Sequence, residues 1–111
     1  MIMSSFFMHH NRGDIYLVLY PFDDKELEKL RPGIILDTME NRSIVIKVTS
    51  HAERSNDPGD IEIRYWREAG LKQPSVARCS QFVPLDHKKI QQYLGQLQKE
   101  DLLNVLERFY K

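Results

Sequence analysis

The strongest structural signal in the chain is a series of short segments rich in β-branched and aromatic residues. Residues 14–20 (DIYLVLY) carry apolar side chains on both faces, and residues 33–37 (GIILD) follow a turn predicted at Arg31-Pro32-Gly33. Residues 44–48 (IVIKV) have the highest density of β-branched side chains. Such segments, separated by polar turns, favour extended backbone. A β-sheet is therefore predicted to begin near the start of the chain.

Further strands and then helices are expected downstream. The turn signal Asp57-Pro58-Gly59 precedes the alternating segment 60–66, which predicts a hairpin, and residues 75–83 contain the last one or two strands. Asp86 is a suitable N-cap for a helix to about Leu97, and residues 101–110 form a second amphipathic helix. Strands first and helices last indicate an α+β domain or a small barrel with a helical appendix.

The length and the single cysteine limit the organisation of the protein. A chain of 111 residues predicts one domain, in which we expect residues 1–11 to form a flexible N-terminus. Cys79 is the only cysteine, and a small fold without disulfides fits a reducing compartment such as the cytoplasm. The N-terminus lacks the basic region of a signal peptide, and no apolar run is long enough to cross a membrane.

The formal net charge is zero, but it arises by cancellation along the chain. Residues 12–63 hold seven Lys or Arg against eleven Asp or Glu, whereas residues 64–89 hold six against two. A neutral total disfavours a protein that coats nucleic acid by bulk charge. The basic stretch is interleaved with Tyr65, Trp66 and Phe82, and could hold a phosphate backbone and stack unpaired bases. Alternatively, it is a solvated charged face beside core aromatics.

Sequence patterns for metals and cofactors are missing. There is no cysteine pair and no His-x₃-His spacing, and His51 and His87 are isolated. No glycine-rich phosphate loop occurs. Cys79 with a distant histidine is better interpreted as a buried thiol than as a nucleophile. We therefore expect neither a metal nor a cofactor.

Polar residues at the ends of the predicted strands are the remaining candidates for chemistry. Arg31 precedes the second strand, Thr49 follows the third, and Arg78 lies near the last. A guanidinium offers a planar fork suited to phosphate oxygens, and a hydroxyl can donate to them. Each residue also has an ordinary structural interpretation, as a strand-end ion pair, a β-strand threonine or a solvated arginine.

Taken in order, six short elements resemble the MazF/PemK family of toxin ribonucleases over about residues 12–110. They are Arg12-Gly13-Asp14-Ile15-Tyr16, Pro21-Phe22, Arg31-Pro32, Thr49-Ser50, the segment from Gly70 through Arg78-Cys79-Ser80-Gln81, and Pro84-Leu85-Asp86. The resemblance implies an SH3-like barrel of antiparallel strands with C-terminal helices, forming a homodimer. It also implies a cognate antitoxin whose disordered acidic segment covers the RNA groove.

The implied activity is metal-independent cleavage of single-stranded RNA, in which the 2′-hydroxyl attacks the adjacent phosphate. The products carry a 2′,3′-cyclic phosphate and a 5′-hydroxyl. By this resemblance Arg31, Thr49 and Arg78 are the catalytic residues. The resemblance also assigns RNA contacts to four further residues: Ser50, His51, Ser80 and Gln81.

The chain departs from some members of the family at Ser80, where they carry an acidic residue two positions after the arginine. A base could then come from Glu26, Glu28 or His51, or the reaction could rely on Arg31 and Thr49 alone. Two other interpretations stay open. The protein could inhibit a protein target such as DNA gyrase, as CcdB-like members of the barrel superfamily do, or it could be a degenerate domain that only binds antitoxin.

Overall fold

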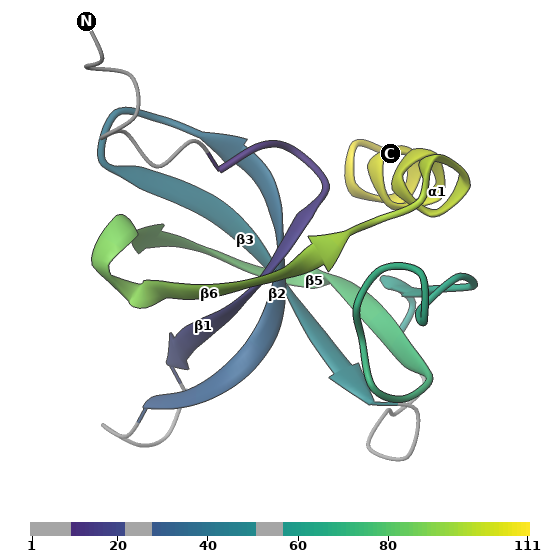
Figure 1. Cartoon of the computed structure of the whole chain (residues 1–111). Helices are drawn as coiled ribbons and strands as arrows, with labels where there is room; N and C mark the ends of the chain where they lie inside the picture. The colour runs from purple at the N-terminus through teal and green to yellow at the C-terminus, as the bar shows by residue number, and fades with distance from the viewer. Residues whose placement is uncertain (1–9, 22–27, 51–56) are drawn as a thin grey trace, which may run out of the picture.

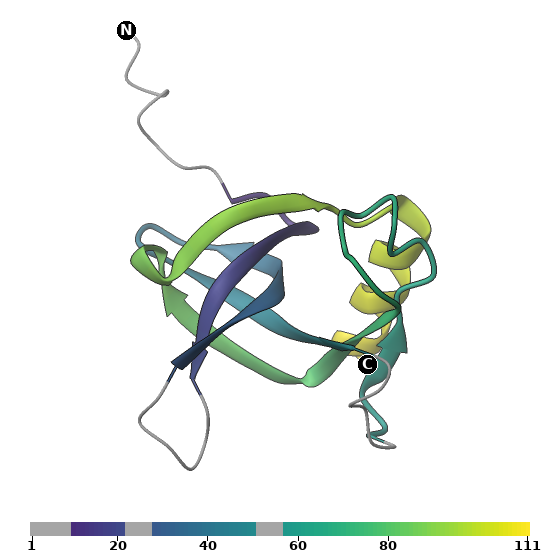
Figure 2. The same ribbon diagram turned by 60° about the horizontal axis from the view of Figure 1, so that its bottom comes forward.

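A computed structural model describes residues 10–21, 28–50 and 57–111. Its strands are β1 (Asp14–Pro21), β2 (Glu28–Thr38), β3 (Arg42–Ser50), β4 (Asp60–Glu62), β5 (Ser75–Asp86) and β6 (Ile90–Gln96), with helix α1 (Lys99–Phe109) last. They form one six-stranded sheet in the order β4-β5-β3-β2-β1-β6, and every pairing is antiparallel (Figure 1). The predicted antiparallel fold with a C-terminal helix is confirmed. The sheet curves like a barrel, yet it does not close, and β4 and β6 are its edges (Figure 2).

Both faces of the central strands are apolar and buried. One face packs against α1 and the segment after β4. Its buried residues include Ile15, Ile34, Ile46, Val48 and Ala77, and α1 contributes Val105 to the same cluster. The opposite face forms a second cluster around Tyr16, Val18, Ile35, Val45 and Ile90. Because both faces of these strands are buried, their sequences are nearly continuous runs of apolar residues.

Position 33 requires glycine because neighbouring strands pack closely there, and not because the chain turns. The predicted turn at Arg31-Pro32-Gly33 is wrong, because these residues lie inside β2. A Cβ atom on Gly33 would lie 2.5 Å from Cγ1 of Val45 and 3.2 Å from Cγ2 of Val18. Glycine therefore lets the side chains of β1 and β3 meet across β2.

The hairpin predicted from the turn at residues 57–59 is also wrong. Strand β4 pairs with β5, which lies between β4 and β3. It is only three residues long. The Ile63 N–H still donates to the Ser75 carbonyl of β5 at 3.0 Å, but the N–H groups after it bond to another element. The N–H groups of Arg64 and Tyr65 donate to the carboxylate of Asp101 in α1, at 2.9 and 2.8 Å.

The helix predicted over residues 86–97 is replaced by a 3₁₀-helix, η3 (His87–Lys89), and strand β6. Asp86 does cap η3, since its Oδ1 accepts from the Lys88 N–H at 3.0 Å. The β6 pairing with β1 has two register shifts, which break strict alternation and mimic helical spacing. Gly95 allows β6 to lie close to the backbone of Ala69, because a Cβ at position 95 would be 2.2 Å from the Ala69 carbonyl oxygen.

The last helix and the N-terminal residues complete the fold. The prediction for residues 101–110 is confirmed, with α1 two residues longer at its start. Of the expected flexible N-terminus, residues 1–9 lie outside the described part of the chain. His10 is buried, and its ring packs edge-on against Tyr16 and His87 at centroid distances of 5.0 and 4.6 Å. No helix in the described part of the chain is long and apolar enough to span a membrane.

Candidate functional site

One face of the sheet collects positively charged side chains from neighbouring strands. Lys29 pairs with Tyr20 across β1 and β2, and Lys47 pairs with Gly33 on one side and Arg78 on the other. Alternate residues of a strand share a face. Lys29, Arg31, Lys47 and Arg78 therefore lie on the same face, and we call this set the basic face. Thr49, two residues after Lys47, lies on it as well.

A small pocket of about 80 Å³ opens where β2, β3 and β5 meet this face. It is lined by Arg31, Pro32, Val48, Thr49, Ser50, Gln73 and Ser75. Its volume matches two or three water molecules, so it suits one small polar group and not a whole nucleotide. The structure thus brings together Arg31, Thr49 and Ser50, which the sequence places in different segments.

The chemistry of this pocket is that of a cation beside hydroxyl groups. The Nε atom of Arg31 is buried, and Thr49 is only 8% exposed. The Ser75 hydroxyl donates to the Gln73 carbonyl at 2.8 Å, which fixes the wall opposite Arg31. Among the described residues, none that lines the pocket carries a carboxylate or an imidazole. The arrangement can stabilise negative charge on an oxyanion.

Gln73 and Ser75 were missed from the sequence. Ser75 reaches the pocket because it pairs with Ser50 in the β3–β5 ladder. Only the strand pairing reveals this neighbour, since the two serines are far apart in the chain. The apolar pattern after Pro74 predicts a strand there, and aligning that strand with β3 would have placed Ser75 opposite Ser50.

Arg78 lies apart from the pocket, in a cluster with two carboxylates. It is buried, with Nη1 3.8 Å from Oδ2 of Asp57 and Nη2 3.8 Å from Oδ2 of Asp60. The Ser80 hydroxyl donates to both carboxylate oxygens of Asp57, at 3.0 and 3.1 Å. The Gly59 N–H, the Ser80 hydroxyl and the Arg78 charge lower the pKa of Asp57 below its usual value. One carboxylate, that of Asp57, thus contacts two predicted site residues, although the sequence suggested only a turn at this position.

Tyr20 of β1 and Lys47 of β3 also lie on the basic face, beside Lys29 and Arg78 respectively. The Lys47 Nζ is 5.6 Å from the centroid of the Tyr20 ring, and the Tyr20 hydroxyl donates to the Gln81 carbonyl at 3.1 Å. The predicted RNA contact Gln81 is half-buried, and its carbonyl serves this internal hydrogen bond. Tyr20 and Lys47 escaped the sequence analysis because each sits inside an apolar strand.

Other candidates from the sequence lie elsewhere. His51 and Glu26 fall outside the described residues, as does the side chain of Glu28. Cys79 is buried as predicted, and burial raises its pKa to about 11. This thiol is therefore protonated and unreactive at neutral pH.

The basic stretch of residues 64–89 does not gather at one surface. Arg64 forms an ion pair with Glu100 of α1 at 2.9 Å, and the Arg67 guanidinium lies 4.8 Å from the centroid of the Trp66 ring. Phe82 packs edge-on against Phe109 at 4.9 Å. The face that collects cations is instead built from alternate positions on different strands.

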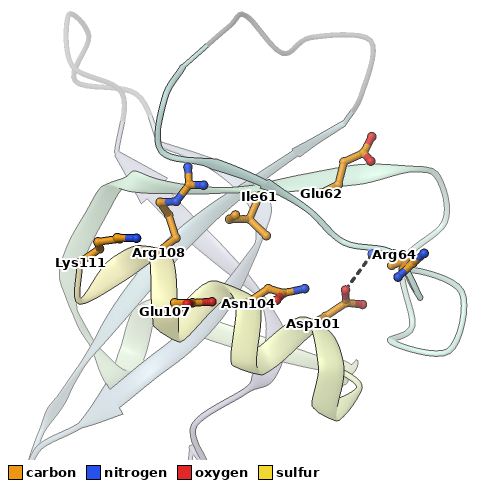
Figure 3. A pocket seen from close by; sticks show the side chains of 8 residues that line it. All are labelled: Ile61, Glu62, Arg64, Asp101, Asn104, Glu107, Arg108 and Lys111. Carbon is orange, nitrogen blue, oxygen red and sulfur yellow. Dashed lines mark hydrogen bonds between the residues drawn. The ribbon is translucent and has the colours of Figure 1, made fainter.

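A larger pocket of about 520 Å³ lies between β4 and α1 (Figure 3). Its lining alternates in charge and consists of Ile61, Glu62, Arg64, Asp101, Asn104, Glu107, Arg108 and Lys111. Asp101 is engaged by the Arg64 N–H, as the dashed line in Figure 3 marks. None of the predicted site residues lines this pocket. Its mixed charge does not favour a polyanion, in contrast to the basic face.

The sequence also matches a known family over nearly its whole length. Residues 11–111 match the family described as PemK-like, MazF-like toxin of type II toxin-antitoxin system. The chain belongs to this family. The family resemblance inferred from the short elements is thereby confirmed.

Solved structures place the fold among MazF toxins. The Mycobacterium tuberculosis toxin MazF-mt6 is 18% identical, with a TM-score of 0.70 over 86% of this chain and 91% of that chain. MazF from Deinococcus radiodurans is 18% identical, with a TM-score of 0.68 over 89% and 91%. An endoribonuclease in complex with its cognate antitoxin from a mycobacterial species is 14% identical, with a TM-score of 0.69 over 88% of both chains. No curated protein matches the chain by sequence.

Proposed function

We propose that this PemK/MazF family member is an endoribonuclease toxin that cleaves single-stranded RNA without a metal ion. The 2′-hydroxyl attacks the adjacent phosphate, the bond from phosphorus to the 5′-oxygen breaks, and the products carry a 2′,3′-cyclic phosphate and a 5′-hydroxyl. The observation that carries the proposal is the pocket lined by both Arg31 and Thr49. Membership of a toxin family adds support.

The roles of the pocket residues follow from their chemistry. Negative charge grows on the non-bridging phosphate oxygens as the new O–P bond forms, and the Arg31 guanidinium meets that charge with N–H donors. The Thr49 hydroxyl orients the 2′-hydroxyl or donates to a phosphate oxygen. Ser50 lines the same pocket and adds a second hydroxyl beside it. A small site suffices, since only the reacting phosphate must enter it.

The rest of the basic face binds the RNA strand on either side of that phosphate. Lys29 and Lys47 share the face with Arg31, so a polyanion crossing the strands meets three cations, with the buried Arg78 beside Lys47. Ser80 and Gln81 lie at the β5 end of this path. Three phosphate contacts predict a slope of about −2 when the logarithm of the binding constant is plotted against the logarithm of the salt concentration. That slope is shallow compared with a protein that coats nucleic acid.

The partners in the proposal are a cognate antitoxin and a second copy of the chain. A structural neighbour is an endoribonuclease bound to its cognate antitoxin, which supports an antitoxin partner here. An acidic antitoxin segment would compete with RNA for the basic face, because both carry negative charge. We also propose that the protein acts in the cytoplasm as a homodimer, and scattering mass in solution tests the dimer.

The test of the function is cleavage of a long single-stranded RNA by the purified protein in EDTA, with mapping of the cut ends. We expect cyclic phosphate ends, and Arg31→Ala should slow cleavage by about 10²- to 10³-fold, as for loss of an oxyanion donor. Thr49→Val keeps the shape and removes only the hydroxyl. Intact RNA would refute the proposal, and intact RNA with inhibited gyrase supercoiling would favour the inhibitor interpretation.

A further inference from the structure

Arg78 is a buried cation held between two carboxylates on the basic face. Its side chain is only 9% exposed, and its two terminal nitrogens each lie 3.8 Å from a carboxylate oxygen, one of Asp57 and one of Asp60. A charge this buried requires partners of opposite charge. The direction of the guanidinium is therefore governed by where these carboxylates stand.

The carboxylate of Asp57 is itself fixed by several contacts. Its Oδ1 accepts from the Gly59 N–H at 2.8 Å, and the Ser80 hydroxyl donates to both its oxygens. The turn that carries it is tied to β5 by the Cys79 N–H, which donates to the Gly59 carbonyl at 3.0 Å. The Arg108 side chain of α1 donates to the Pro58 carbonyl. Asp57 is thus held from two elements, so it can act as a fixed reference for Arg78.

The position of Arg78 relative to the pocket suits a shared substrate. Thr49 pairs with Val76, and Lys47 pairs with Arg78, so Arg78 is two residues along β5 from the level of Thr49. Strand β2, which carries Arg31, lies one strand beyond β3. Strands are spaced by about 4.8 Å, so the backbones of β2 and β5 are about 10 Å apart. One RNA strand lying across the face can meet both arginines.

We propose that Asp57 is a positioning residue for RNA cleavage, holding Arg78 over the basic face while Ser80 orients the Asp57 carboxylate. The inference rests on the proposed function. Some family members carry a carboxylate at the position of Ser80. In this chain the Ser80 hydroxyl instead donates to the carboxylate of Asp57, in the turn at residues 57–59. The acidic group beside Arg78 is thus supplied by another segment.

The contacts of Asp57 favour orientation over proton transfer. The Gly59 N–H, the Ser80 hydroxyl and Arg78 all stabilise the ionised carboxylate and lower its pKa. A carboxylate stabilised in this way is a weak proton acceptor near neutral pH. Its contribution is to keep the guanidinium in place, and misplacing a reacting or charge-stabilising group by about 1 Å can cost about 10²-fold in rate.

The test is Asp57→Asn, which keeps the size of the side chain and an oxygen that accepts from Gly59 but removes the charge. We expect kcat for RNA cleavage to fall by about tenfold or more, with a small change in KM and in melting temperature. Asp86→Asn is the matched control, because Asp86 also accepts from the N–H two residues later in the chain. It pairs with Arg42 at the far end of the β3–β5 ladder. Unchanged kcat in Asp57→Asn would overturn the inference.

A second change separates positioning from support of the turn. Asp57→Asn combined with Ser80→Asp returns a carboxylate to the neighbourhood of Arg78 from β5, and we expect most of the lost kcat to recover. A role limited to holding the turn predicts no recovery, so failure of this rescue also counts against the inference.

The NMR signals of the Arg78 Nη–H groups report the Asp57 contact without any need for cleavage. They should shift in Asp57→Asn and not in Asp86→Asn. If the native protein leaves RNA intact, the proposed function fails. An unmoved Arg78 signal refutes the positioning role by itself.

Discussion

Asp101 is the residue on which we expect the stability of the domain to depend most clearly. Its side chain is fully buried in the first turn of α1 and accepts the backbone N–H groups of Arg64 and Tyr65 at 2.9 and 2.8 Å. A hydrogen bond to a charged group contributes about 1.5–3 kcal/mol. Asp101→Ala removes two such bonds and leaves two N–H donors without their partner. We expect a loss of about 3–5 kcal/mol, against a typical total of about 5–15 kcal/mol.

The assay is urea unfolding followed by circular dichroism, with the free energy of unfolding extrapolated to water. Glu100→Gln is the control, because Glu100 lies in the same turn and also pairs with Arg64, at 2.9 Å. The two side chains of that pair are 68% and 50% exposed, so its loss should cost less than about 1 kcal/mol. The argument fails if Asp101→Ala costs less than about 1 kcal/mol, or if the two variants lose the same amount.

Three further measurements test other parts of the structure. Cys79, with its pKa raised to about 11 by burial, should react slowly with iodoacetamide at pH 8 in the folded protein and quickly in urea; fast labelling of the folded protein would contradict its burial. Ser80→Ala should raise the pKa of Asp57 in an NMR titration, because a hydrogen bond to the ionised form is lost. Because folding lowers the pKa of Asp57, its ionised carboxylate stabilises the folded protein at pH values above the unfolded pKa. This stabilisation is lost as the pH falls through the pKa of the folded state. In Ser80→Ala the folded pKa is higher, so the stabilisation should be lost at a higher pH. Gly95→Ala should lower stability by about 1–3 kcal/mol or more, because its Cβ would lie 2.2 Å from a carbonyl oxygen, whereas Gln92→Ala on the exposed side of β6 should change little in the same urea assay.

The local pattern of the sequence was sufficient for the strands at the centre of the sheet. Segments 14–20 and 44–48 combine β-branched residues with apolar side chains on both faces, and both are strands with buried residues on each face. The helix at residues 101–110 was predictable for a similar reason, since its apolar face repeats with helical spacing. In these segments local propensity and tertiary packing favour the same structure.

The sequence misled where tertiary contacts overrode spacing. Residues 90–96 have apolar side chains at helical intervals, but the open edge of β1 pairs with them, and the register shifts hide the strand pattern. The short length of β4 depends on a carboxylate about forty residues later, which no local rule reveals. The turn at residues 57–59 was predictable from its residues. That its Asp57 carboxylate lies beside Arg78 was not, because this contact depends on the tertiary fold.

For the candidate site, the family resemblance did what local chemistry could not. Arg31 and Thr49 have unremarkable neighbours in sequence, and only the β2–β3 register brings them to one pocket. Arg78 was predicted to act with them, and the structure puts it in a separate cluster on the same face. Its catalytic role stays a prediction.

Strand β1 pairs with β6, which is synthesised much later, and this has a consequence for folding during translation. A ribosome synthesises β1 long before β6 and α1, yet β1 lies between β2 and β6, and the core behind β1–β3 is covered by α1. The Leu97 N–H closes this arrangement by donating to the Gly13 carbonyl at 2.9 Å. A growing chain that stops short of α1 lacks Val105 and so leaves that core cluster uncovered. The domain therefore completes this hydrophobic core only after the residues of α1 have left the ribosome.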